Sequence, residues 1–246
     1  MSALEPELEA LLLKTVPGLA REWKGATPAE IEQMGRLAGR PLPPFYRWFL
    51  ERMGQSMGPL AYPRYDFSPQ GVLACYAEEL VQPDPRFLLI AYDSDELLPL
   101  HLFYDLDLPV RGDAAVARRH ASGGDLHYRF ETLREMLAWT AFFRFRVGAL
   151  PQRCKGTLLG EHPILPRLGP VMSRLGFTEP VPTGPFCGLF ERPGAAMHCN
   201  STPSEEGILS FTLGGGDVGV LRRLLGELAQ EPSLQVKVSE WLHAPG

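Results

Sequence analysis

Apolar residues near the start of the chain recur with the 3.6-residue period of an amphipathic helix. This spacing predicts a helix over residues 3–14, with a buried stripe made by Leu4, Leu8, Leu11 and Leu12. A second helix is predicted to begin at Thr27, because Pro28 suits the first helical position and Glu30 completes a capping box. A third is predicted over residues 45–53, with an apolar face made by Phe45, Phe49 and Met53.

From about residue 71 the apolar period shortens to two, which is typical of strands. Short strands are predicted over residues 71–75, 87–92, 100–104, 115–119 and 126–128. Polar turns at 93–96 and 122–125 separate four of them, and a helix is predicted over 132–145. Helices, then antiparallel strands, then a closing helix are typical of an α+β domain with its N-terminal helices packed on the sheet.

The rest of the chain predicts a second, smaller α+β domain of unknown role. We expect a first domain over residues 1–147, a linker over 148–160 and the second domain over 161–246. Within the second domain the pattern predicts helices over 165–175 and 218–229, and strands over 186–191, 195–199, 208–213 and 234–241.

Composition narrows the class of protein. The chain has 246 residues, 45% of them apolar, and a formal net charge of −5. It contains no apolar run long enough to span a membrane, and acidic residues stand near its start where a secretory signal carries positive charge. Four cysteines without a close pair do not resemble a disulfide framework. These features predict a soluble cytoplasmic protein that binds neither membrane nor nucleic acid, and whose negative field favours a basic partner.

Residues 214–219 match the dinucleotide-binding pattern G-x-G-x-x-G and lie between a predicted strand and a predicted helix. However, Asp217 would place a carboxylate where a pyrophosphate should bind. An N-terminal helix cap made by Asp217 after a glycine-rich turn explains the same sequence, so no cofactor is predicted.

Potential metal ligands and nucleophiles occur in the second half of the chain: Cys154, His162, Cys187, His198 and Cys199. Their spacing fits no known zinc pattern, and adjacent residues of a strand point to opposite faces. Cys187 and His198 can form a nucleophile–base pair only if the fold brings them together. We predict no metal site and no catalytic residue. The alternative explanation of these residues is two buried cysteines and an exposed histidine.

Acidic residues gather at the predicted hairpin: Asp93, Asp95 and Glu96 in one turn, with Asp105 and Asp107 after the next strand. Turns select aspartate for local hydrogen bonds to the backbone, which is one explanation. The other is a protein-binding surface, since aromatic residues lie beside these acids. On this second interpretation the contact residues are Tyr92, Asp93, Asp95, Glu96, Phe103 and Asp105.

The segment from Thr27 to Gly54 combines a capped helix, the run Leu37-Ala38-Gly39-Arg40-Pro41-Leu42-Pro43-Pro44 and an aromatic helix that ends in glycine. Together with the hairpin FLLIAYDSDELLPLHLFYDLD, it resembles the SUKH superfamily over about residues 25–145. That superfamily includes many bacterial immunity proteins of polymorphic toxin systems and the fungal regulators of the Smi–Knr type.

The resemblance implies a non-enzymatic binding module that neutralises a cognate protein toxin, and it transfers no catalytic residue. Two alternatives stay open. One is a regulatory scaffold that binds a protein other than a toxin, as the fungal proteins suggest. The other is an enzyme that uses the C-terminal domain, through Cys187 and His198 or through the glycine-rich loop.

Overall fold

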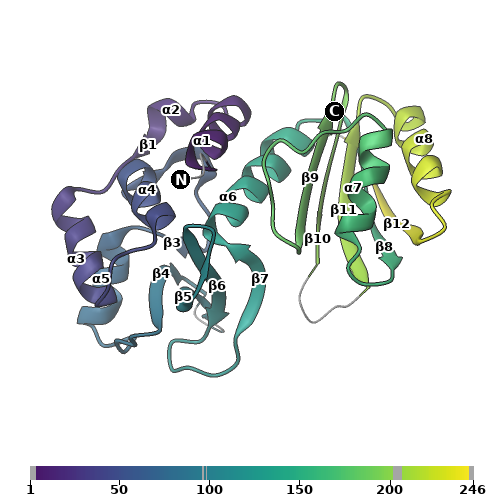
Figure 1. The fold of residues 1–246 in the computed structure, drawn as a ribbon. Helices are drawn as coiled ribbons and strands as arrows, with labels where there is room; N and C mark the ends of the chain where they lie inside the picture. The colour runs from purple at the N-terminus through teal and green to yellow at the C-terminus, as the bar shows by residue number, and fades with distance from the viewer. Residues whose placement is uncertain (1–3, 96, 98, 202–206, 244–246) are drawn as a thin grey trace. The chain divides into compact units, whose positions relative to one another are not determined.

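The computed structural model describes residues 4–95, 97, 99–201 and 207–243. The expected α+β class is confirmed, with helices and mainly antiparallel sheets (Figure 1). Contacts divide the chain into two compact units, Met1–Leu137 and Ala138–Gly246, which are described separately below. Among the described residues, no helix has both the length and the apolar character needed to cross a membrane.

The first unit begins with the helices that the apolar pattern predicts. Its helices are α1 (Leu4–Thr15), α2 (Leu19–Glu22), α3 (Pro28–Ala38), α4 (Pro44–Met53) and α5 (Pro69–Ala77), with a short 3-10 helix, η1 (Gly58–Leu60). The predicted capping box is present in α3: the Glu30 amide donates to Thr27 Oγ1 at 3.3 Å, and the Thr27 amide donates to Glu30 Oε2 at 2.7 Å.

Helices α4 and α5 pack on a five-stranded antiparallel sheet ordered β3-β4-β5-β6-β7 (Figure 1). Its strands are β3 (Tyr65–Asp66), β4 (Phe87–Asp93), β5 (His101–Val110), β6 (Asp113–Arg119) and β7 (His127–Thr132). A separate pair, β1 (Trp23–Lys24) with β2 (Ser56–Met57), links the helices. Phe45, Tyr46 and Phe49 of α4 and Phe103 and Tyr104 of β5 are fully buried and form much of the core.

The β5–β6 hairpin turns at Arg111 and Gly112, whose φ angles of 48° and 83° are those of a type I′ turn. Gly112 also contributes to a helix, because its carbonyl accepts a hydrogen bond from the Phe45 amide at 3.0 Å. Pro43, the N-cap residue of α4, offers no side-chain cap. The hairpin therefore caps α4 in place of a local side chain.

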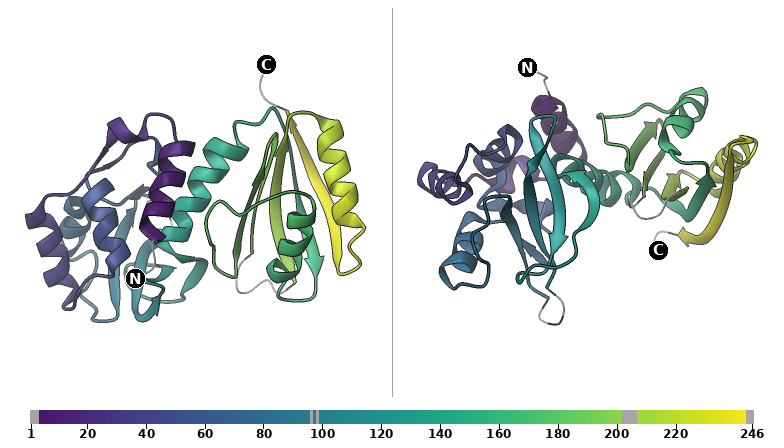
Figure 2. Two further views of the ribbon diagram at one scale, coloured as in Figure 1. Left: turned by 45° about the horizontal axis from the view of Figure 1, so that its top comes forward. Right: turned by 60° about the horizontal axis from the view of Figure 1, so that its bottom comes forward.

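In the second unit, one five-stranded sheet ordered β12-β8-β11-β10-β9 carries helices on its faces (Figure 2). Its strands are β8 (Gln152–Gly160), β9 (Cys187–Arg192), β10 (Ala195–Asn200), β11 (Ile208–Gly215) and β12 (Leu234–His243). Helices α7 (Leu165–Arg174) and α8 (Val218–Ala229) share one apolar core with one face of this sheet. Helix α6 (Leu133–Ala141), in which the division between the units falls, continues as a π-helix, η2 (Phe142–Val147).

Two of the predicted segments differ in secondary structure from what was expected. The strand expected over residues 71–75 is wrong, because these residues lie in α5, which Ser68 caps through a 3.0 Å hydrogen bond from the Gly71 amide. Gln152–Gly160, expected in a linker, forms β8 at the interior of the second sheet. Cys154 and Leu158 point into the core from β8, so this segment contributes to the apolar core of the unit.

Candidate functional site

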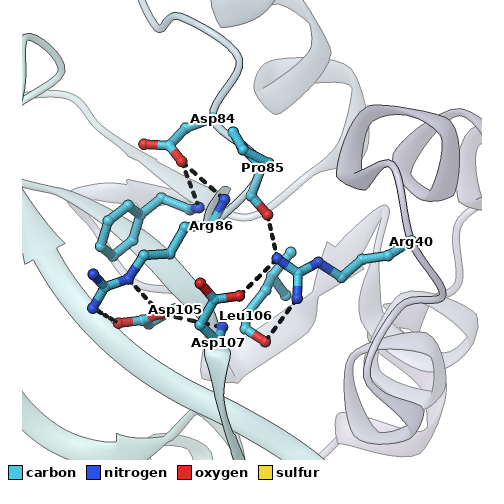
Figure 3. Close-up of polar contacts among 8 residues, drawn as sticks. Arg40, Asp84, Pro85, Arg86, Asp105, Leu106 and Asp107 are labelled. Atoms are coloured by element: carbon cyan, nitrogen blue, oxygen red, sulfur yellow. Dashed lines mark hydrogen bonds and ion pairs between the residues drawn. The ribbon is translucent and has the colours of Figure 1, made fainter.

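Asp105 is the centre of a polar network at one end of the first sheet (Figure 3). Its carboxylate is fully buried, and Arg86 binds it with two hydrogen bonds, from Nε at 3.0 Å and from Nη2 at 2.7 Å. The Asp107 amide donates to the same carboxylate at 3.2 Å. Charge-assisted bidentate pairs of this kind fix both side chains in one orientation.

Arg40 joins this arrangement from the loop between α3 and α4. Its guanidinium donates to the Leu106 carbonyl at 3.2 Å, to the Pro85 carbonyl and to Asp107 Oδ1 at 2.9 Å. Asp84 completes the set by accepting hydrogen bonds from the amides of Arg86 and Phe87 (Figure 3). We call Arg40, Asp84, Arg86, Asp105 and Asp107 the Arg40–Arg86 network.

Asp93 repeats the same arrangement at the other end of β4. Its buried carboxylate binds Arg64 through Nε at 3.3 Å and Nη2 at 3.0 Å, and accepts the Asp95 amide at 3.1 Å. Burial raises the pKa of Asp93, but hydrogen bonds from Arg64 and from the amides of Asp95 and Leu100 outweigh this effect and hold the pKa below its ordinary value.

The strand register explains the repetition. Asp93 lies opposite Tyr65 and Asp105 lies opposite Phe87, so each buried carboxylate faces the residue that follows its arginine. Because β4 has seven residues, the two ends are about 20 Å apart. The predicted acidic residues therefore belong to two separate clusters rather than to one edge.

Aromatic side chains lie near both ends of β4. The Arg119 guanidinium lies 4.3 Å from the ring centre of Phe87 and 4.7 Å from that of Phe103. At the other end, Tyr92 stacks on His101 at 5.0 Å, and His101 Nδ1 accepts a hydrogen bond from the Asp93 amide at 3.0 Å. Burial lowers the pKa of His101, which favours the neutral imidazole as the acceptor of this hydrogen bond.

The expected contact surface requires a correction. Asp93, Phe103 and Asp105 are fully buried, because the two aspartates are paired with arginines and Phe103 packs in the core, so these three do not present themselves to a partner. Tyr92 and Asp95 are partly exposed, and Glu96 lies outside the described residues.

Sequence reasoning missed the arginines. The exposed fractions of the Arg40, Arg86 and Asp107 side chains are 37%, 46% and 56%, and that of Asp84 is 35%. The accessible part of the network is therefore every member except Asp105. The sequence does contain a signal for the arginines that bind the buried carboxylates. The pattern Asp-x-Asp occurs twice, at 93–95 and 105–107, and Arg64 and Arg86 each directly precede an aromatic residue.

An open groove of about 820 Å³ lies next to the network between α3 and α4. Its apolar lining includes Ile31 and Leu42, and its charged lining includes Arg36 and Arg47. Arg40 belongs both to this lining and to the network. Groove and network are therefore one continuous surface of the first unit.

The residues considered for chemistry in the second unit lie in or beside its sheet. Cys199 points into the apolar core, where burial raises the pKa of its thiol strongly, and burial raises the pKa of Cys154 to about 11. Neither is a thiolate at neutral pH. Cys187 is buried in β9 opposite Asn200, while His162 is exposed.

His198 points to the face opposite Cys199, between the rings of Trp139 at 5.0 Å and Phe143 at 4.8 Å. Neither of its ring nitrogens has a hydrogen-bond partner among the described residues, and burial lowers its pKa to about 3. Over the described ranges, no group of three or more His, Cys, Asp or Glu side chains is arranged to hold a metal ion. The cap interpretation of Asp217 is confirmed, because its Oδ1 accepts the Val220 amide at 2.8 Å.

Comparison with family models, with curated proteins and with solved structures gives no match for this chain. The resemblance to the SUKH superfamily stays a prediction from the sequence.

Proposed function

We propose that this chain is a cytoplasmic, non-catalytic immunity protein that binds a cognate protein toxin and neutralises it. The proposal starts from the SUKH resemblance. It is supported by the order of the elements in the first unit: a capped helix α3, a proline-rich loop, the aromatic helix α4, the β4–β5 hairpin and the helix α6.

The observation that carries the proposal is the Arg40–Arg86 network. Arg40 is held by three hydrogen bonds and Arg86 by two, yet more than a third of each side chain is exposed. Side chains fixed before binding lose little conformational entropy when a partner arrives. Exposed arginines that are fixed against the end of a sheet, beside an open groove, are features of protein-binding surfaces.

Electrostatics support binding of a protein more than a chemical reaction. The aspartates at the two ends of β4 are neutralised by their own arginines, and Cys154, Cys199 and His198 are uncharged at neutral pH. The net charge of −5 attracts a basic toxin at long range and increases the rate of encounter. The network then supplies the directional short-range contacts.

The test is a titration of toxin activity with this chain. A candidate toxin encoded beside its gene is mixed with increasing amounts of the purified protein, and residual toxic activity is measured. A binding inhibitor abolishes the activity at a fixed stoichiometric ratio, whereas an enzyme that destroys the toxin acts at far lower amounts. Unchanged toxin activity at excess protein, or inactivation by a small fraction of an equivalent, contradicts the proposal.

Charge-reversal variants locate the contact. Asp107→Lys changes the exposed part of the network, Asp95→Lys changes the other end of β4, and Asp125→Lys is a matched control in an exposed turn. We expect Asp107→Lys alone to weaken toxin binding at least about tenfold, measured by calorimetry. If Asp95→Lys alone weakens toxin binding, the contact surface lies instead at the end of β4 where Arg64 binds Asp93.

A further inference from the structure

Strand β12 is an open edge of the second sheet. Among the described strands it pairs with β8 alone, so its other side presents backbone groups that no described strand binds. The opposite edge differs, because Thr178 and Glu191 exchange backbone hydrogen bonds of 2.9 and 2.8 Å beside β9. An uncovered edge strand of ten residues is a ready template for another strand.

A β-bulge between Val238 and Glu240 decides which side chains share a face of β12. Lys237 lies opposite Thr157 and Glu240 lies opposite Lys155, two residues apart on β8. Since alternate residues of a strand point to the same face, Lys237 and Glu240 share a face, although they are three residues apart.

The same argument holds for the apolar residues. Val236 lies opposite Leu158 and Trp241 lies opposite Cys154, and both of these β8 residues point into the core. Val236 and Trp241 therefore share the face opposite to that of Lys237 and Glu240. Without the bulge, the members of each pair would point to opposite faces.

We propose that β12 pairs in the antiparallel direction with β12 of a second copy of this chain, about a two-fold axis between Val238 and Ser239. In this register Lys237 lies opposite Glu240 of the second copy, and Val236 lies opposite its Trp241. The two-fold axis repeats each contact, so one strand supplies both halves of a self-complementary interface. The lysine and glutamate are opposite in charge on one face, and the valine and tryptophan are both apolar on the other.

Charge and exposure favour a second copy over an arbitrary strand. A bulge and a lysine on an edge strand oppose pairing with most strands, but Glu240 of a second copy places a carboxylate opposite this lysine. Val238 and Trp241 are 38% and 39% exposed, so apolar surface is available to leave water on pairing. Glu240 already binds Lys155 of its own chain at 3.2 Å, and both side chains are about half exposed.

Sedimentation velocity of the full chain over a range of concentrations tests the interface. We expect a species with twice the mass of one chain, and a dimer dissociation constant raised about tenfold or more by Lys237→Glu, which places like charges opposite each other twice. Adding Glu240→Lys to this variant restores opposite charges across the interface and most of the affinity. Arg222→Glu, the same charge change on the exposed side of α8, leaves the dimer unchanged.

Disulfide crosslinking tests the register. Val236→Cys combined with Trp241→Cys forms a reducible covalent dimer under mild oxidation, while either single variant does not, because position 236 faces position 241 of the second copy. The four native cysteines are buried. A wild-type chain that is monomeric at every concentration, a dimer that Lys237→Glu leaves intact, or a double cysteine variant that crosslinks no more than the single variants would each overturn the proposal.

Discussion

The backbone amide of Arg134 donates a hydrogen bond to Oδ2 of Asp113 at 3.1 Å, which ties the first residue of β6 to the first turn of α6. The Asp113 side chain is buried. Burial raises its pKa from an ordinary value of 3.8 to about 7, and the Tyr104 hydroxyl together with the Arg134 and Ala114 amides offsets only part of this rise. At weakly acidic pH Asp113 is therefore an uncharged carboxylic acid.

This pKa makes the stability of the first unit depend on pH. Between about pH 4 and pH 7 the folded state holds a proton on Asp113 that the unfolded chain has released. The stabilisation that this bound proton gives is complete below about pH 4 and is lost as the pH rises through 7. Over this range the free energy of unfolding falls by up to about 1.4 kcal/mol per pH unit. Asp113→Asn keeps an acceptor for Arg134 but does not titrate.

Urea unfolding at a series of pH values checks this expectation. The free energy of unfolding of the wild type, minus that of Asp113→Asn, should fall between about pH 4 and pH 7 and stay level above about pH 8. A difference that is the same at every pH would show that Asp113 ionises normally in the folded state.

His198 should give a slope of the opposite sign in the second unit. Its pKa falls from an ordinary 6.5 to about 3, so below 6.5 the unfolded chain binds a proton that the folded chain excludes. The stability that depends on neutral His198 is complete above pH 6.5 and is lost as the pH falls towards 3.

His198→Phe removes the titrating group and preserves an aromatic ring between Trp139 and Phe143. We expect this variant to be at least as stable as the wild type at pH 7, and to lose less stability down to about pH 4. Thermal unfolding at several pH values measures both effects. The control is His162→Gln, which replaces an exposed histidine; an acid response shared by both variants would contradict the assignment.

Asp105 and Asp107 should differ in their contribution to stability. Asp105→Asn removes the charge from a buried bidentate pair, and we expect a loss of about 2 kcal/mol in the free energy of unfolding. Asp107→Asn changes an exposed ion pair, and its cost should stay within about 0.5 kcal/mol. Denaturant titration of both variants makes the comparison, and equal losses would mean that Asp105 is not the structural centre of the network.

Gly156 of β8 has no room for a side chain. An added Cβ would collide with the Lys237 carbonyl and with the ring of Phe211, so Gly156→Ala should destabilise the second unit by at least about 2 kcal/mol. Gly35 in α3 is the matched control, because its Cβ position meets nothing within 4 Å. Gly35→Ala should stabilise the first unit by up to about 1 kcal/mol, and calorimetry of both variants checks the contrast.

Local signals in the sequence were enough for most of the fold. The capping box at Thr27, the N-terminal cap at Asp217 and the leucine stripe of α8 depend on residues a few positions apart, and each is present as predicted. The error at α5 is also local. Ser68 followed by Pro69 is a helix-start signal, and it outweighs the short alternating pattern that suggested a strand.

The candidate site was harder to predict, because its geometry depends on residues far apart in the sequence. Asp93 is paired with Arg64, 29 positions away, and Arg40 reaches Asp107 across 67 positions of the chain. A sequence pattern shows that acids and aromatic residues alternate, but strand register decides which carboxylates are neutralised. Strand β8 was missed for a related reason. Its glycines interrupt the alternation of apolar and polar residues, and its strand structure depends on pairing with β11 and β12, which lie far along the chain.

The double role of Gly112 has a practical consequence for labelling the protein. Hairpin tips usually tolerate inserted tags, but an insertion between Arg111 and Gly112 would also remove the acceptor of the Phe45 amide and expose the start of α4. The turn at residues 122–125 carries positive φ angles at Gly123 and Gly124, and an added Cβ at either glycine meets nothing within 4 Å. An epitope or a fluorophore belongs in that second turn, where the helix start is left intact.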